Sequence, residues 1–216
     1  MSIVGQKRFG PGDFSVGLVH EALAILGKFG FAPEMLKRIA DSKSGMAEMV
    51  VKLFLPKLPI FKTITLGVYG SVKAYREALT KAGFQIGAWA NDILNKTQVS
   101  QSQVQLDLVV LSVAELRFSK AVRYDAICAK AKDFGFELCP PEMGLALRLA
   151  YPDQPYGEWL RIAMNPIVYP VYPGSVPQLF VVGHGNDGRI LLKDFGNTGT
   201  LWPLGCRFVF VRPHKQ

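Results

Sequence analysis

Apolar residues recur every three or four positions in the first third of the chain, as in Val16, Val19, Leu23 and Leu26. This spacing places them on one face of a helix. Two further segments of the same kind follow, and both end before the Pro56-Lys-Leu-Pro59 stretch, through which neither a helix nor a strand passes easily. The pattern predicts a helical N-terminal unit, residues 1–60, followed by a second domain, residues 61–216.

Short strand patterns and helix patterns then follow one another. We predict strands over residues 63–66, 106–113 and 136–139, and helices over residues 71–82, 86–94 and 124–134. Residues 106–113 are apolar at nearly every position, which indicates a strand buried on both faces. Together with the helix and strand that come next, they predict an α/β segment made of a strand, a helix and a returning strand.

Past Leu145 the apolar spacing changes to two. This period predicts a strand over residues 145–151, with a short helix after Pro141 as the alternative. Further strands are predicted over residues 159–164, 178–182, 189–192 and 207–211, with turns rich in proline and glycine between them. The predicted fold class is α+β, in which the helical unit and the α/β segment run into an antiparallel β meander.

Composition and charge narrow the choice of partner and compartment. The 216 residues are 49% hydrophobic, and 25 basic against 17 acidic side chains give a net charge of +8, which favours an anionic partner. The cysteines Cys128, Cys139 and Cys206 are odd in number and widely spaced, so we expect no disulfide framework, no metal site and a cytoplasmic location. No apolar run reaches the roughly 20 residues of a membrane-spanning helix, so we expect no membrane span.

Residues Gly183-His-Gly-Asn-Asp-Gly188 match the glycine pattern of dinucleotide-binding loops. Such a loop must be followed by a helix, whose N-terminal N–H groups bind the pyrophosphate. Here a strand pattern follows instead, and Asn-Asp-Gly suits the positive φ angles of a tight turn. We therefore predict a type I′ hairpin and no nucleotide cofactor.

The candidates for catalysis are Cys139, Glu142, Glu158 and His184. His184 could act as a base toward Cys139 as the nucleophile, and the two glutamates could act as acid and base, as in a hydrolase. Cysteine is among the most buried residue types, and Cys139 precedes two prolines at the end of a predicted strand. A structural thiol is therefore the favoured interpretation.

The candidates for binding are Arg148, Asp153, Gln154 and Trp159. Prolines and a glycine place the acids of this segment in a surface loop. We expect Arg148, on a strand face, to pair with Asp153 or Glu158 across the turn.

Residues 75–94 have the outline of a helix-turn-helix with Gly83 in its turn, which allows DNA binding. The exposed face of the second helix would present Asn91, Asp92, Asn95 and Lys96, and this is a poor surface for phosphates. A packed helix pair is favoured, and nucleic-acid binding stays an alternative.

Several segments resemble a bacterial family of uncharacterised proteins over about residues 62–212. They are Asp107–Leu116, Leu138–Glu142, Leu147–Leu149, Gln154–Trp159 and Phe208–Arg212. The resemblance implies a single module after Pro59 and carries no activity, cofactor or catalytic residue.

The sequence shows no catalytic constellation, and it places aromatic residues around the predicted turns. They are Tyr151, Tyr156, Trp159, Tyr169, Tyr172 and Trp202. We therefore interpret the chain as a non-enzymatic protein that binds an unknown protein or an anionic partner. The alternatives are a hydrolase that uses the central acids with His184, and a basic nucleic-acid-binding protein.

Overall fold

The computed structural model describes residues 59–169, 176–197 and 199–213. The chain divides between Leu58 and Pro59 into two units, and the described residues all belong to the second. The helices predicted before residue 58, and Tyr172, lie outside the described residues.

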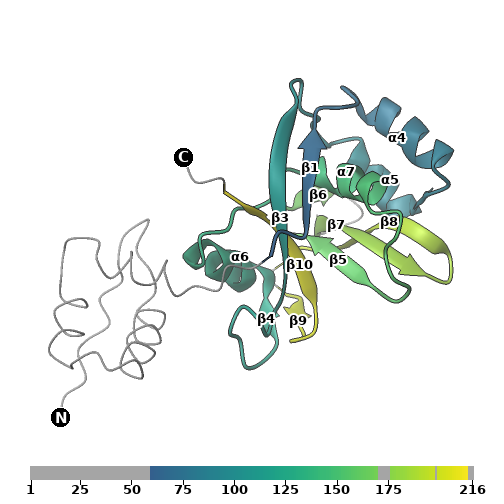
Figure 1. Ribbon diagram of the computed structural model, residues 1–216. Helices are drawn as coiled ribbons and strands as arrows, with labels where there is room; N and C mark the ends of the chain where they lie inside the picture. Colours follow the sequence, from purple (N-terminus) through teal and green to yellow (C-terminus); the bar gives the residue numbers. More distant parts are fainter. Residues whose placement is uncertain (1–58, 170–175, 198, 214–216) are drawn as a thin grey trace, which may run out of the picture. The chain divides into compact units, whose positions relative to one another are not determined.

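Four helices and ten strands form the described domain, so the mixed α+β class is confirmed (Figure 1). The helices are α4 (Val72–Lys81), α5 (Ala88–Leu94), α6 (Tyr124–Asp133) and α7 (Met143–Ala150). The strands are β1 (Lys62–Leu66), β2 (Gln85–Ile86), β3 (Val104–Ser112), β4 (Val122–Arg123), β5 (Trp159–Ile162), β6 (Ile167–Tyr169), β7 (Val176–Gly185), β8 (Gly188–Phe195), β9 (Leu201–Trp202) and β10 (Arg207–Arg212).

One large mixed sheet has the strand order β1-β3-β10-β5-β7-β8-β2, and β6 pairs with β7. The predicted meander is correct for the antiparallel neighbours β5, β7 and β8. It is wrong for the last strand, because β10 lies between β3 and β5 and runs parallel to β5. Four consecutive buried residues, from Phe208 to Val211, explain this central place, since both faces of a central strand are covered.

The predicted α/β segment is also wrong. β3 is antiparallel to both of its neighbours, β1 and β10. Residues 136–139 form no strand and make only isolated bridges, from Glu137 to Val211 and from Cys139 to Met164. The chain turns at once into Pro140 and Pro141, which lack the N–H groups that a longer ladder needs.

Residues 145–150 belong to helix α7, so the strand predicted there is wrong and the helical alternative is right. All residues from Met143 to Arg148 are buried. A segment that is buried all round has no polar face, and its apolar spacing then fits a strand as well as a helix.

Helix α7 contacts both β1 and β7, which are separated by three strands in the sheet. Strands lie about 4.8 Å apart, so a flat sheet would hold these two about 19 Å from each other. A helix with its side chains is only about 10 Å wide. The sheet therefore curls around α7, and its concave face is the one that the helix covers.

The two faces of the sheet have different coverings. On the concave face Gly144 of α7 lies against Phe180, where an added Cβ would come within 2.7 Å of the Phe180 Cβ. On the convex face Phe208 meets Tyr124 of α6 and Trp202 of β9 in aromatic contacts. Side chains alternate between faces along each strand, so the register decides on which side each candidate residue lies.

The segment with the outline of a helix-turn-helix, for which the sequence favours a packed helix pair, contains a strand. Ser71 caps α4, and Gly83 after it has φ of +75°, as predicted for its ends. Ile86, however, lies in β2, which pairs in parallel with β8 and separates α4 from α5. The two helices therefore flank a sheet edge and do not form a helix-turn-helix unit.

Candidate binding site on the β7–β8 hairpin

Arg148 is fully buried at the C-terminal end of α7. Its Nη1 donates to Gln154 Oε1 (2.5 Å) and to the main-chain oxygen of Gly183 (3.1 Å), and its Nη2 donates to the main-chain oxygen of Tyr151. The guanidinium also lies 4.7 Å from the centre of the Phe84 ring. Burial, with a further contribution from the nearby Arg189, lowers the pKa of Arg148 to about 10.

The predicted pairing of Arg148 with Asp153 or Glu158 is wrong. Asp153 lies 3.8 Å from Lys62 Nζ, and Glu158 accepts from Arg207 Nη1 at 2.6 Å. Arg148 leaves α7 toward β7, because it is on a helix rather than on the predicted strand. Its partners are the side-chain oxygen of Gln154 and the main-chain oxygens of Tyr151, at the end of α7, and of Gly183 in β7.

Gln154 extends this buried network into the loop of residues 151–158. Its Nε2 donates to the main-chain oxygens of Val182 (3.1 Å) and Glu158 (3.2 Å). His184 Nδ1 donates to the main-chain oxygen of Gln154 (2.7 Å), and the Gly157 N–H donates to the main-chain oxygen of His184 (2.8 Å). The loop is thus attached to the end of β7 at several points.

The indole ring of Trp159 lies on the backbone of Gly183 and Gly185. A Cβ added at Gly183 would come within 2.2 Å of the ring, and one at Gly185 within 3.0 Å. The register pairs Trp159 with Gly183, which puts the ring on the convex face. Two of the three glycines in the apparent dinucleotide pattern therefore make room for an aromatic ring.

The third glycine forms the hairpin. Gly188 has φ of +82° and pairs with Gly185 across the turn, so the predicted hairpin is confirmed. The predicted turn type is wrong, because Arg117 is the only non-glycine residue with positive φ in the described ranges and Asn186 and Asp187 therefore lack it. A left-handed glycine after the turn is the pattern of hairpins that combine a type I turn with a bulge.

Tyr156 and Trp159 remain accessible on the two sides of this hairpin, with exposed fractions of 68% and 37%. The Tyr156 ring meets the His184 ring edge-on at 5.6 Å, and its hydroxyl donates to Asn186 Oδ1. Both aromatic side chains are thus held by contacts at one end and open to solvent at the other. We call the surface formed by residues 151–159 and 183–189 the hairpin surface.

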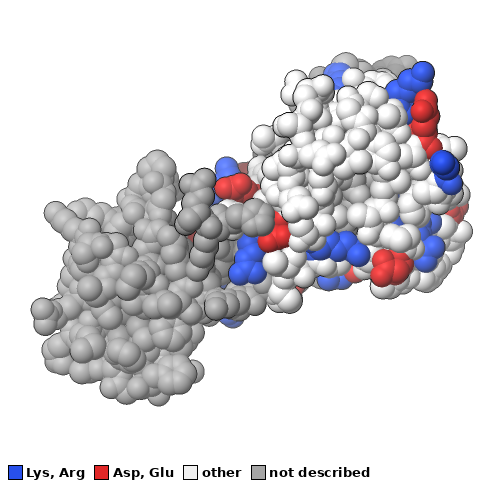
Figure 2. Space-filling model, turned by 45° about the horizontal axis from the view of Figure 1, so that its top comes forward, with Lys and Arg blue, Asp and Glu red and all other residues white. Residues whose placement is uncertain are grey.

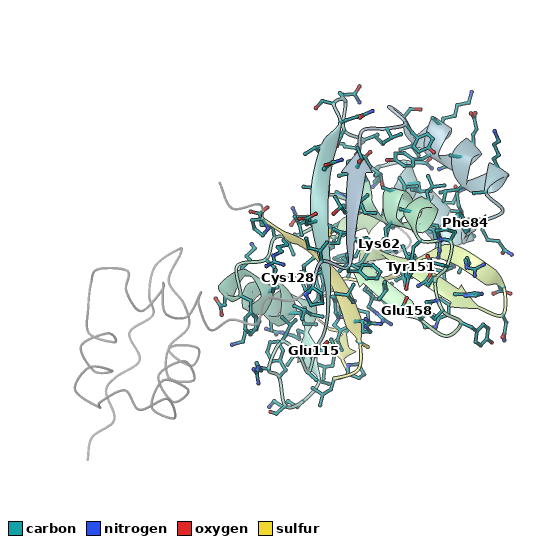
Figure 3. The ribbon with its side chains drawn as sticks, in the orientation of Figure 1. Lys62, Phe84, Glu115, Cys128, Tyr151 and Glu158 are labelled. Carbon is teal, nitrogen blue, oxygen red and sulfur yellow. The ribbon has the colours of Figure 1, made fainter. Side chains whose placement is uncertain are left out.

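Glu158 belongs to a polar group beside the loop. Figure 3 shows Glu158, Tyr151 and Lys62 near one another, and Lys62 Nζ lies 4.7 Å from the centre of the Tyr151 ring. Burial and a hydrogen bond to Glu158 raise the pKa of the Tyr151 hydroxyl to about 12. Glu158 thus pairs with Arg207 and also raises the pKa of the Tyr151 hydroxyl.

The catalytic candidates do not form one group. Cys139 is buried, its thiol lies 3.4 Å from the main-chain oxygen of Val209, and burial raises the pKa of that thiol far above its ordinary value. Its sulfur has no carboxylate or imidazole partner in the hydrogen bonds described. Glu158 and His184 are neighbours through the backbone only, with a hydrogen bond from the His184 N–H to the main-chain oxygen of Glu158.

Glu142 is buried at the start of α7 and stabilises a different region. One carboxylate oxygen accepts from the Gly67 N–H (2.8 Å) and the Tyr75 hydroxyl (2.7 Å), and the other accepts from the Ser100 N–H (2.7 Å). Burial raises the pKa of this carboxyl, but the hydrogen bonds outweigh burial, so its pKa is lowered overall. An ionised carboxylate also suits the N-terminal end of a helix.

Other features of the described domain lie outside the hairpin surface. An open hollow of about 470 Å³ is lined by Lys132, Gly135, Phe136, Glu137, Leu138 and Asn165. The described residues include no cluster of three or more metal-ligating acids, histidines or cysteines. They also include no helix that is both long and apolar enough to cross a membrane.

The chain matches no protein-family model, no curated protein and no solved structure. The site must therefore be judged from its own residues. Arg189 and Gly183 are among the residues of the hairpin surface that the sequence did not single out for binding. Two glycines at i and i+2 within a strand were the available signal, because they leave one face of the strand without side chains.

Proposed function

We propose that this chain is a non-enzymatic binding protein and that it binds its partner through the hairpin surface. The observation that carries the proposal is the buried Arg148–Gln154 network beneath exposed aromatic side chains. A loop that is already ordered loses little conformational entropy when a partner binds. Tyrosine and tryptophan with one end held and the other accessible are typical of binding surfaces.

The hydrolase alternative has less support. A nucleophile and its base must lie within hydrogen-bonding reach of each other. The Cys139 thiol, the Glu142 carboxylate and the His184 ring each have a separate main-chain partner. These contacts position parts of the backbone and leave the four candidates without a common substrate position.

Nucleic-acid binding requires Lys and Arg side chains clustered on one face of the protein. The face seen in Figure 2 is largely uncharged, and its Lys and Arg side chains are mixed with Asp and Glu toward the edges. A small or protein partner with a limited anionic group fits such a distribution better than a phosphate backbone does.

Retention of partners by the immobilised full chain tests this proposal. We expect a molecule that the wild type retains from cell extract to be lost with Tyr156→Ala. It should be kept with Tyr69→Ala, a control at another partly exposed tyrosine (38%). Equal retention by both variants, or turnover of ester or amide substrates that Glu158→Gln abolishes, would contradict the proposal.

A further inference from the structure

Arg148, and Arg189 of the hairpin surface, have no acidic partner among the residues that the structure describes. Arg148 is fully buried, and Arg189 on β8 is half-buried. The ion pairs between described residues involve neither of them. The Nε atoms of both are buried and have no hydrogen-bond partner among the residues described.

The register brings these arginines to the same place. Arg189 pairs with His184 across the hairpin, so both side chains lie on the concave face, directly opposite each other. Arg148 approaches that face from α7 and donates to the main-chain oxygen of Gly183, the residue before His184. Phe84 covers one side of the Arg148 guanidinium.

Asp187, the acid nearest to Arg189 in sequence, is exposed in the hairpin turn and belongs to none of the ion pairs between described residues. The other acids of this region have partners elsewhere. Glu158 pairs with Arg207, and Asp153 lies near Lys62. On the convex face Asp194 pairs with Arg161 at 3.2 Å. A buried cation without a counter-charge is strongly unfavourable, and a second arginine nearby adds repulsion. An anion bound at this position would relieve both effects.

We propose that Arg189, with Arg148 behind it, binds an oxyanion of the partner, either a carboxylate or a phosphate group. This rests on the proposed function, since it names the chemistry that the hairpin surface recognises. A guanidinium presents N–H groups in a planar fork that matches two oxygens of either group. Tyr156, which packs on His184, would contact the part of the ligand next to the oxyanion.

Thermal unfolding of the full chain with added anions tests the site. Sodium phosphate and sodium acetate are titrated at constant ionic strength against sodium chloride, and the two arms distinguish a phosphate from a carboxylate. We expect saturable stabilisation by at least one of them. Arg189→Gln should weaken the apparent affinity about tenfold or more, because charge-assisted hydrogen bonds are lost. Arg161→Gln, the control on the other face, should leave it unchanged.

The unliganded variant gives a second measurement. Without added oxyanion Arg189→Gln should unfold at the same temperature as the wild type or higher, since repulsion with Arg148 is removed. No saturable effect of either anion, an equal effect in Arg189→Gln, or a marked loss of stability in that variant would overturn the oxyanion site. The retention experiment with Tyr156→Ala decides the proposed function separately, because it requires no added anion.

Discussion

The contact between Trp159 and Gly183 predicts a mutation whose effect on stability changes sign with its neighbour. An ideal Cβ at Gly183 would lie 2.2 Å from two ring carbons of Trp159. Carbon atoms in contact are separated by about 3.5 Å or more, so the indole would have to move by about 1.3 Å in Gly183→Ala. Overpacking of this kind costs about 1–3 kcal/mol of unfolding free energy.

Gly183→Ala also makes a stabilising contribution to the unfolding free energy. Alanine in a strand is favoured over glycine by about 0.5–1 kcal/mol, because glycine loses more backbone entropy on folding. We therefore expect Gly183→Ala to destabilise the wild type by about 0.5–2 kcal/mol. In the Trp159→Ala background, with the ring absent, it should stabilise by about 0.5–1 kcal/mol.

Urea unfolding followed by far-ultraviolet circular dichroism measures all four proteins of this cycle without relying on tryptophan fluorescence. Gly185→Ala serves as a graded control, since its added Cβ would lie 3.0 Å from the ring and its effect should be smaller. An equal effect of Gly183→Ala in both backgrounds would refute the placement of the indole on this backbone.

Three further predictions concern the buried polar groups. Arg148→Met should lower the unfolding free energy by about 3–5 kcal/mol in urea unfolding, because three buried oxygens lose a charged donor, and a neutral result would contradict the network. Glu142→Gln should lower it by about 2–3 kcal/mol at pH 7. Because the pKa of Glu142 is lowered in the folded protein, the carboxylate stabilises the fold fully above the ordinary glutamate pKa of about 4.3. This stabilisation is lost as the pH falls through the pKa of the folded state. The difference in unfolding free energy between Glu142→Gln and the wild type should therefore shrink below about pH 4. A difference independent of pH would show that the carboxylate charge has no role. Cys139 should resist thiol-modifying reagent in the native protein and react after unfolding, as judged by mass spectrometry of peptides, and rapid native labelling would contradict its burial.

Local patterns predicted the elements whose causes are local. Ser71 and Gly83 bound α4, and Asn186-Asp-Gly188 forms a hairpin, because capping and positive φ depend on a few adjacent residues. The alternation around Leu145 misled, since α7 is buried on every side and carries no polar face to reveal its period.

The remaining features depend on contacts that are distant in sequence. The strand pairings that place β10 between β3 and β5 join residues 42 or more positions apart, and so do the hydrogen bonds of Glu142. Arg148, Gln154 and Trp159 could be selected from the sequence as binding candidates, but their roles could not. Arg148 and Gln154 are buried beneath the loop of residues 151–158 and hold it by hydrogen bonds. Only the pairing of Trp159 with Gly183 explains why β7 contains two glycines.

Amide hydrogen exchange within residues 151–159 tests most directly whether the hairpin surface is preformed. The N–H groups of Gly157 and Glu158 donate to the main-chain oxygens of His184 and Pro155, at 2.8 and 3.2 Å. Although Gly157 is exposed, we predict that both amides exchange far more slowly than an unprotected peptide in nuclear magnetic resonance spectra of the full chain. Exchange of both at the unprotected rate, while the amides of β7 stay protected, would contradict a preformed binding surface.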